Sequence, residues 1–240
     1  MSFELNKALD TKAIHKDFET HGYVHISDVF PDDVASRIYA ALLGETPWNM
    51  VFTDRGKHVD MLAAQLEKMD RQQVIQLQQS IYAQAQQDFQ YCYNNYSIFD
   101  AVKAGINKGH VLHELYEWLN DEAFLGFARG ATGFDDISFL DAQATRFKPG
   151  HFLTTHDDTQ RGKKRRAAYI FGFSPDWLPD WGGYLQLFDD DGNARIGLKP
   201  TYNSLNILAI PQRHNVSIVA PFAGGMRHSI TGWLRYGDPE

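Results

Sequence analysis

The spacing of apolar residues changes in character about halfway along the chain. In residues 1–134 apolar positions recur at helical intervals, within segments rich in Ala, Gln, Leu, Glu and Lys. This spacing predicts helices over 32–42, after the turn at Pro31, over 61–96 as one or two helices, near 109–118 and near 121–131. The alternating segment from Gly22 to Phe30 predicts a strand.

From about residue 135 onward, short β-prone runs replace the helical spacing, and Gly, Pro and Asp clusters separate them. The runs are ISFLDAQATRF, HFLTTHDD, AAYIFGFS, GGYLQLF, SLNILAI, HNVSIVA and MRHSITGWLR. Many short strands at regular spacing predict a barrel or a sandwich over 135–236. We therefore expect a mostly β fold with α-helices, in which the helices of 1–134 brace one face of the sheet within a single domain, 1–240.

Composition and charge narrow the class of protein. The chain has 240 residues, of which 43% are hydrophobic and 22% charged, as in an ordinary globular protein. The formal net charge of −7 argues against a nucleic-acid partner, and no apolar run is long enough to predict a membrane span. The single cysteine, Cys92, and the charged N-terminal segment without an apolar core fit a reducing, cytoplasmic location.

The run Thr154-Thr155-His156-Asp157-Asp158 carries the first candidate metal ligands. Side chains two residues apart on a strand point to the same face, so His156 and Asp158 can aim at one point. Asp157 could replace Asp158 only if the strand ends before it. The pair alone is equally a hydrogen-bonded surface turn, so further ligands must come from elsewhere in the sequence.

The C-terminal β-prone runs supply a third ligand and a candidate anion site. His214 opens one run, and Arg227 opens the next. In that second run, alternate positions form two sets. The mainly polar set is Arg227, Ser229, Thr231 and Trp233. The mainly apolar set is His228, Ile230, Gly232 and Leu234. This pattern predicts that the polar set lines a wet cavity, where Arg227 is a buried cation that needs an anionic partner.

The motifs in the second half resemble the prolyl-hydroxylase branch of the 2-oxoglutarate/Fe(II) dioxygenases, which includes the hypoxia-factor-type and ribosomal-protein-type prolyl hydroxylases and bacterial relatives. The matching blocks run in the family's order and cover about residues 140–235. They are FKPGHFLTTHDD at 147–158, RAAYIF at 166–171, WGGYLQL at 181–187, RHNV at 213–216 and RHSITGW at 227–233.

The resemblance implies a double-stranded β-helix, or jelly roll, with His156, Asp158 and His214 as Fe(II) ligands. It also implies that Arg227 binds the distal carboxylate of the cosubstrate 2-oxoglutarate, while Thr231 and Trp233 line the same pocket. The implied reaction consumes O2 and releases succinate and CO2; ascorbate is kept open as an accessory.

The sequence departs from the family at Phe147, where relatives often carry a tyrosine whose hydroxyl bonds the cosubstrate. We expect Tyr169, on the next strand, to supply that bond. The aromatic run 91–96 is either one side of a substrate groove or a helix that packs on the sheet. The basic run 161–166 is interpreted as a solvated loop, with a lid or a contact to an acidic substrate as the alternative.

Three functions stay open at this stage. The leading one is hydroxylation of a prolyl residue in a protein or peptide; the second is hydroxylation of a small molecule such as an amino acid or secondary metabolite. The third is a jelly roll that binds a ligand without turnover. A broad groove beside the metal would favour a peptide, and a closed apolar pocket a small molecule. The sequence leaves the oligomeric state open.

Overall fold

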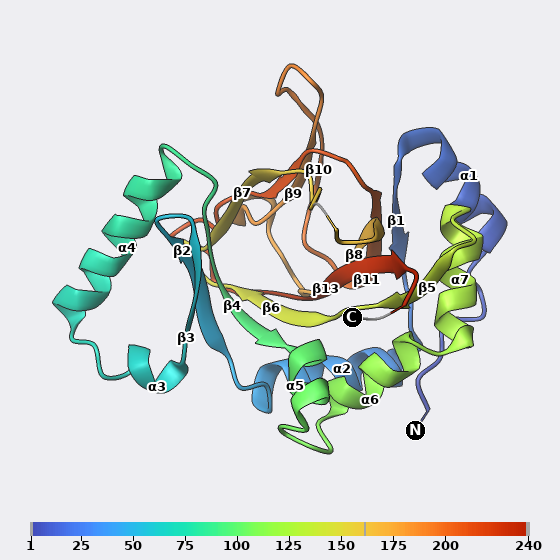
Figure 1. The fold of residues 1–240 in the computed structure, drawn as a ribbon, viewed down its shortest axis with the longest axis horizontal. Coiled ribbons are helices and arrows are strands. Elements are labelled where there is room, and N and C mark those ends of the chain that lie inside the picture. The colour runs from blue at the N-terminus through green and yellow to red at the C-terminus, as the bar shows by residue number, and fades with distance from the viewer. Residues whose placement is uncertain (1, 161, 239–240) are drawn as a thin grey trace.

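The structure is a computed structural model that describes residues 2–160 and 162–238 (Figure 1). The helices are α1 (Thr11–His21), α2 (Asp32–Gly44), α3 (Ala63–Leu66), α4 (Arg71–Ala85), α5 (Ile98–Ala104), α6 (Val111–Leu119), α7 (Glu122–Thr132) and the 3-10 turn η1 (Pro179–Trp181). The strands are β1 (Tyr23–Ser27), β2 (Asn49–Asp54), β3 (Lys57–Met61), β4 (Tyr91–Ser97), β5 (Ile137–Leu140), β6 (Gln143–Phe147), β7 (Phe152–His156), β8 (Arg165–Phe173), β9 (Leu185–Phe188), β10 (Ala194–Leu198), β11 (Tyr202–Ala209), β12 (His214–Val216) and β13 (Arg227–Tyr236).

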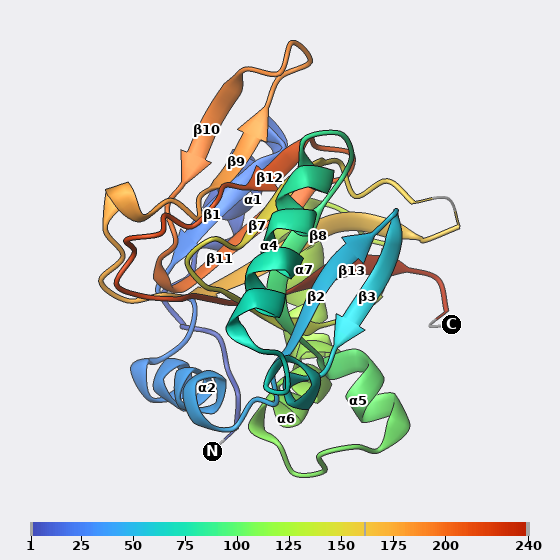
Figure 2. The same ribbon diagram turned by 90° about the vertical axis from the view of Figure 1, so that its left-hand side faces the viewer.

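The strands form one antiparallel sheet in the order β1-β11-β8-β13-β6-β4-β7-β12-β9-β10, with the β2–β3 hairpin attached to β4 and β5 attached to β13. Figure 1 shows the sheet curled over, so that β7, β9 and β10 face β6 and β13 across an interior, and Figure 2 shows the β9–β10 hairpin projecting at one end. This is a jelly-roll sheet, and the predicted fold class is confirmed.

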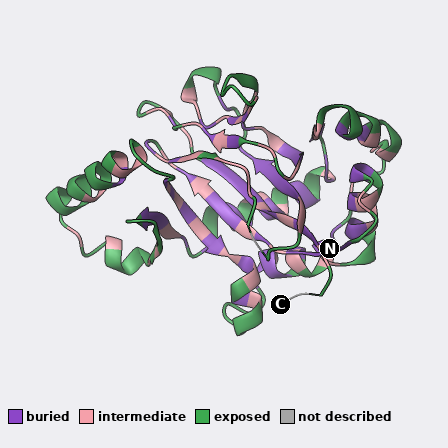
Figure 3. Ribbon diagram, turned by 45° about the horizontal axis from the view of Figure 1, so that its top comes forward, coloured by how far each residue is buried: buried purple, intermediate pink, exposed green. Residues whose placement is uncertain are grey.

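The N-terminal helices brace the outer face of this sheet, as the sequence predicts. The largest buried cluster joins side chains of α2, α6 and α7 to the core-facing positions of β8 and β13; examples are Ile38, Leu115, Phe124, Phe171 and Ile230. Figure 3 shows the burial concentrated in the sheet and on the sheet-facing sides of the helices. By contrast, α4 packs mainly through Ile81 onto the smaller cluster beneath the β2–β3 hairpin.

The prediction of one or two helices over 61–96 is wrong in its last part. Helices α3 and α4 occupy its middle, but 91–97 is the strand β4, whose side chains alternate strictly between buried and half-buried. The aromatic residues there favour a strand, and pairing with β2 and β6 outweighs the helical spacing that precedes them. The β2–β3 hairpin, which turns at Arg55 and Gly56 with positive φ angles, was not predicted either.

Every β-prone run identified after residue 135 contains a strand, whereas β10 was not predicted. Among the described residues, no helix combines the length and the apolar character that crossing a membrane requires.

Candidate active site

Two histidines meet where β7 and β12 pair. His156 is the last residue of β7, His214 is the first of β12, and the two are register partners in the antiparallel pair. Their ring centroids lie 4.2 Å apart. Because directly opposed residues of an antiparallel pair project to the same face, both imidazoles point into the interior of the curled sheet.

Asp158 joins them from the loop after β7, by a route that the sequence argument did not anticipate. The strand ends at His156, so spacing along a strand does not align the two side chains. Instead, Asp158 has a φ of 62°, in the left-handed region that Asp and Asn adopt more readily than other non-glycine residues. This turn brings its carboxylate to 3.4 Å from His156 Nε2 and 3.5 Å from His214 Nε2.

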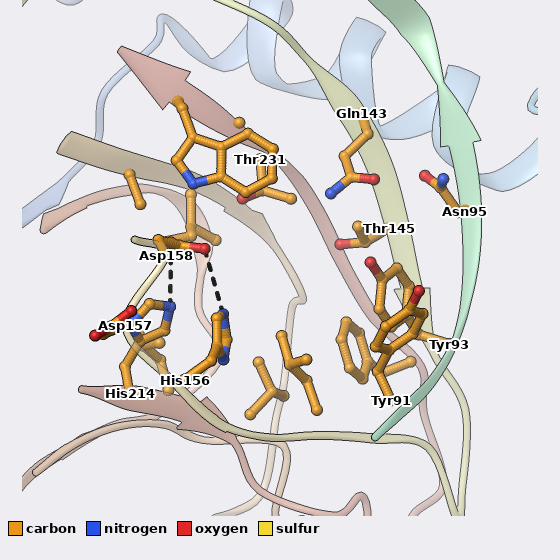
Figure 4. Close-up of a pocket in the computed structure, with 18 of the residues that line it drawn as sticks. Tyr91, Tyr93, Asn95, Gln143, Thr145, His156, Asp157, Asp158, His214 and Thr231 are labelled. Atoms are coloured by element: carbon orange, nitrogen blue, oxygen red, sulfur yellow. Dashed lines mark ion pairs between the residues drawn. The ribbon is translucent and has the colours of Figure 1, made fainter. Parts of the chain in front are cut away.

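Asp157 takes a separate role although the strand ends before it. One of its carboxylate oxygens accepts a hydrogen bond of 2.9 Å from the backbone N–H of Thr159. The cluster whose potential ligand atoms all lie within 4.8 Å of one another consists of His156, Asp158 and His214 (Figure 4). The structure therefore brings together the three predicted metal ligands.

The hydrogen bonds behind the two histidines show that this cluster fits a metal ion. His156 Nδ1 lies 3.0 Å from the carbonyl oxygen of Thr154, and His214 Nδ1 lies 2.7 Å from that of Gln212. A carbonyl only accepts, so both Nδ1 atoms carry a proton; in the neutral form of each ring, Nε2 then presents a lone pair to the Asp158 carboxylate. Lone pairs that converge on a carboxylate are stabilised by a cation between them.

The charge states agree with metal binding. Burial lowers the pKa of His214, and the neighbouring His156 lowers it further, so His214 is a neutral imidazole. Burial alone would raise the pKa of Asp158, but its contacts with the two imidazoles outweigh that effect and leave the pKa below its ordinary value. His214 thus offers a neutral nitrogen, and Asp158 offers an anionic oxygen.

His156, Asp158 and His214 form one wall of a cavity of about 580 Å³ inside the curled sheet. Figure 4 shows the triad on one side, Tyr91 and Tyr93 of β4 on the opposite side, and Thr231 between them. Apolar side chains of both layers complete the lining, among them Leu153, Ile170, Leu185 and Val216. The cavity can therefore hold a metal ion together with more than one small ligand group.

Three of the four polar residues predicted to face the cavity from strand β13 do so, whereas Ser229 is buried outside the cavity lining. Arg227, Thr231 and Trp233 line the cavity, whereas Ile230 and Leu234 lie in the core against the helices. Position 232 of this strand is a glycine because a Cβ there would lie 2.0 Å from the carbonyl oxygen of Asp141. The close approach of β13 to Asp141 requires glycine.

Arg227 is a buried cation that faces the cavity. Its side chain is 6% exposed, and burial lowers its pKa to about 10, which leaves it charged at neutral pH. Within residues 2–160 and 162–238, no carboxylate forms an ion pair with it. A buried cation without a protein counter-charge is suited to an anionic ligand.

Tyr169 does not reach the cavity, so the expectation that it replaces the missing hydroxyl at Phe147 is corrected. Its neighbours Ala168 and Ile170 line the cavity, which places Tyr169 on the opposite face of β8. Tyr169 is fully buried in the core, and its hydroxyl donates a hydrogen bond of 2.8 Å to the carbonyl oxygen of Asp141.

Trp233 lies where it was predicted, beside the metal ligands. Its backbone N–H donates to Asp141 Oδ1 at 2.9 Å, and its indole interacts with the Asp158 carboxylate and helps to lower the pKa of that group. The guanidinium of Arg165 also stacks on the indole ring, 3.5 Å from the ring centroid. Trp233 therefore contacts the metal-binding loop.

Arg165 is a functional candidate that the sequence argument missed. The run 161–166 was interpreted as a solvated loop; Arg161 lies outside the described residues, but Arg165 opens β8 and lines the cavity. It donates a hydrogen bond of 3.1 Å to the carbonyl oxygen of Asp158. The sequence signal that could have identified Arg165 as a site residue was its position shortly after the His156-Asp157-Asp158 motif. Arg166, next to it, pairs with Asp136 on the surface.

A jelly-roll sheet in which two histidines and one carboxylate converge has the fold and the candidate ligand set that non-haem Fe(II) oxygenases use. Comparison with known proteins agrees. Residues 142–235 match the sequence model of the 2OG-Fe(II) oxygenase superfamily.

Two curated proteins and two solved structures illustrate the similarity. Prolyl 3-hydroxylase OGFOD1 of Xenopus laevis is 30% identical over 133 residues, which is 52% of this chain and 24% of that protein. The mouse (Mus musculus) protein of the same name is 30% identical over 120 residues, 47% of this chain and 22% of that protein. The chain therefore spans about a quarter of the length of these relatives.

Among solved structures, a prolyl-4-hydroxylase of Pseudomonas putida aligns with a TM-score of 0.57 and 16% identity, over 99% of each chain. A Trichoplax adhaerens prolyl hydroxylase, solved with a peptide fragment of hypoxia inducible factor, aligns with a TM-score of 0.64 and 14% identity, over 94% of this chain and 89% of that one. Over residues 142–235 the chain is thus similar to the 2OG-Fe(II) oxygenase superfamily, and the relatives and solved structures named here are prolyl hydroxylases.

Proposed function

We propose that this protein is a 2-oxoglutarate- and Fe(II)-dependent dioxygenase that hydroxylates a C–H bond, most readily that of a prolyl residue in a protein or peptide. The observation that carries the proposal is that one cavity holds both the cluster of His156, Asp158 and His214 and the buried cation Arg227, which has no carboxylate partner among the described residues. The first can hold the metal, and the second can hold a dicarboxylate.

In this proposal His156, Asp158 and His214 hold Fe(II), and their arrangement leaves coordination positions open towards the cavity. Arg227 binds the distal carboxylate of 2-oxoglutarate, and Thr231 adds a hydroxyl from the same face of β13. When bound, the iron and 2-oxoglutarate supply the oxidation by O2, with succinate and CO2 as products.

In this proposal the residues of the chain orient the metal-binding side chains and exclude water. The backbone carbonyls of Thr154 and Gln212 fix the two imidazoles, and Arg165 holds the loop that carries Asp158. The apolar lining keeps water away from the metal-facing space. No protein side chain is needed as a general base in this scheme, because the reaction removes a hydrogen from carbon by oxidation.

The choice of a prolyl substrate rests on similarity and on the shape of the site. The curated relatives are named prolyl 3-hydroxylases, and both solved structures compared above are named prolyl hydroxylases. The cavity reaches the surface at Phe89 and His58, so a side chain of a larger molecule can enter while the rest of that molecule stays outside.

The test is succinate formation by the Fe(II)-loaded chain with 2-oxoglutarate, screened against cell extract and proline-containing peptides. We expect succinate above background and an increase of 16 Da in a stimulating peptide, with neither in the His156→Ala variant. Absence of 2-oxoglutarate turnover under every condition would contradict an enzyme and support a binding protein. Stimulation by amino acids or metabolites alone would contradict the peptide substrate.

A further inference from the structure

A row of aromatic side chains runs from the mouth of the cavity, beside His156, to its floor, beside Arg227. We call it the aromatic ladder; it consists of Phe89, Tyr91, Tyr93 and Phe147. Successive ring centroids lie 5.7, 5.6 and 4.9 Å apart. At the inner end, the guanidinium of Arg227 lies over Phe147.

The backbone explains the regular spacing. Phe89, Tyr91 and Tyr93 are alternate residues leading into and along β4, so their side chains share one face of the sheet. Phe147 ends the neighbouring strand β6 and stacks on Tyr93 with an interplanar angle of 19°. All four rings line the cavity, and Figure 4 shows Tyr91 and Tyr93 facing the triad across it.

The outer end of the ladder is exposed to solvent. Phe89 is 47% exposed, and its ring lies 5.5 Å from that of the metal ligand His156. Next to it, the Tyr91 hydroxyl lies 2.6 Å from His58 Nδ1 on β3, so the β2–β3 hairpin fixes this ring. An exposed phenylalanine beside a metal ligand has no role in the core of the protein.

Tyr93, in the inner part of the ladder, is buried and uncharged. Burial raises the pKa of Tyr93 well above its ordinary value, so its hydroxyl stays neutral, and the side chain of Gln143 hydrogen-bonds to it. A neutral hydroxyl and an amide beside an aromatic face suit an amide-flanked aliphatic ring better than a charged group.

A continuous row of aromatic rings suits an extended peptide. A polyproline II helix has three residues per turn and advances about 3.1 Å per residue, so residues on one face recur every third position, about 9 Å apart, which reaches beyond one step of the ladder (5.7 or 5.6 Å). Proline-rich segments in this conformation dock on aromatic-lined grooves in other protein classes.

We propose, resting on the function proposed above, that the aromatic ladder is the substrate-binding wall and takes an extended prolyl-containing peptide. One pyrrolidine ring packs against Tyr93, and the residue three positions away, on the same face of the extended peptide, packs against Phe89. Phe89 is then a residue that determines substrate specificity, because it selects for an apolar ring beyond the reacting residue.

The test measures peptide binding rather than turnover. The full chain is loaded with Mn(II) and 2-oxoglutarate, and a blocked pentaproline is compared with a blocked pentaalanine by calorimetry and ligand-observed NMR. We expect pentaproline to bind more tightly. We also expect the paramagnetic Mn(II) to broaden its pyrrolidine signals, while Zn(II) in the same site leaves them sharp.

Variants of two exposed phenylalanines test whether the ladder contributes to peptide binding. Phe89→Ala should weaken pentaproline binding about tenfold and Phe89→Leu, which keeps apolar bulk without an aromatic face, about threefold. Phe222→Ala is the matched control, since Phe222 is 72% exposed and lies outside the cavity lining. It should bind pentaproline as the wild type does.

Three results would contradict the proposed role of the ladder in peptide binding: no binding of pentaproline by the wild type, equal binding of the two peptides, or unchanged binding by both Phe89 variants. Should Phe89→Ala fail to fold, judged by circular dichroism, Phe89→Leu decides. Binding of 2-oxoglutarate to the Mn(II)-loaded wild type is measured first, without peptide. Its absence would contradict the proposed function, whereas unchanged Phe89 variants would contradict only the ladder.

Discussion

The guanidinium of Arg227 lies over the ring of Phe147, 5.0 Å from the ring centroid. The two residues are also register partners in the β6–β13 pair, so the backbone fixes them side by side. A cation–π contact stabilises a guanidinium without neutralising it. Phe147 can therefore hold Arg227 in place while its charge remains available to a ligand.

Replacement of Arg227 by alanine is expected to weaken 2-oxoglutarate binding. Hydrogen bonds to charged groups contribute about 1.5–3 kcal/mol, which corresponds to a rise in Kd of about tenfold to more than a hundredfold. Calorimetry with the Mn(II)-loaded chain measures this Kd directly. Arg213→Ala is the control, because Arg213 is exposed and donates to the Asp190 carbonyl. An effect of Arg213→Ala instead of Arg227→Ala would reassign the anion site.

Removal of a metal ligand is expected to abolish metal binding and, with it, succinate formation. His156→Ala and Asp158→Ala each leave two of three ligands, and Mn(II) titration followed by electron paramagnetic resonance should show a loss of at least about a hundredfold in affinity. Asp157→Asn, which changes the adjacent carboxylate, should bind Mn(II) as the wild type does. Normal turnover by both alanine variants would contradict the assignment of the triad.

The sequence predicted the fold class from strand patterning, and the family resemblance singled out three residues that the structure brings together. Alternation along β13 separated cavity-facing from core-facing residues, and His156, Asp158 and His214 stood out by residue type. The reason given for Asp158 was wrong, since a left-handed turn rather than a strand aligns it. Backbone conformation in a loop is set by tertiary context, which spacing along the sequence does not report.

The parts of the site that the sequence missed depend on pairing between distant strands. Phe89 reaches the cavity only because β4 lies between β6 and β7, and the residues of β4 followed a helical run in the sequence. Arg165 resembled the solvated charges before it, and its stacking on Trp233 follows from the β8–β13 pairing. Tyr169 was placed in the cavity because the face of β8 cannot be read from a continuously apolar strand.

The Tyr169→Phe variant tests the corrected placement of that hydroxyl. Loss of its hydrogen bond to the Asp141 carbonyl should lower the free energy of unfolding by about 1 kcal/mol, measured by urea denaturation. Because the hydroxyl does not face the cavity, the Kd for 2-oxoglutarate should stay at the wild-type value. A large rise in that Kd without loss of stability would restore Tyr169 to the cosubstrate site.

His228 should make the stability of the protein depend on pH. Burial, and the nearby Arg146, lower the pKa of His228 from 6.5 to about 4. Between these values the unfolded chain binds a proton that the native state does not, so the free energy of unfolding falls as the pH decreases, by at most about 1.4 kcal/mol per pH unit from this residue.

Replacing His228 with glutamine should flatten that dependence. The measurement is urea denaturation at several pH values between 6.5 and 4, compared with the wild type. The slope, rather than the stability at any single pH, is the relevant quantity, because the substitution also changes packing against Tyr39 and Trp48. An unchanged slope would show that His228 is protonated in the native state.

The left-handed backbone at residue 158 also limits which amino acids evolution can place there. Apart from glycine, only asparagine and aspartate adopt this conformation routinely. Of these three, only aspartate supplies a carboxylate to the metal. The substitution usually regarded as conservative, Asp158→Glu, therefore keeps the charge but meets an unfavourable backbone, while Asp158→Asn and Asp158→Gly keep the backbone and lose the anion. Two independent requirements thus leave a single residue type at this position.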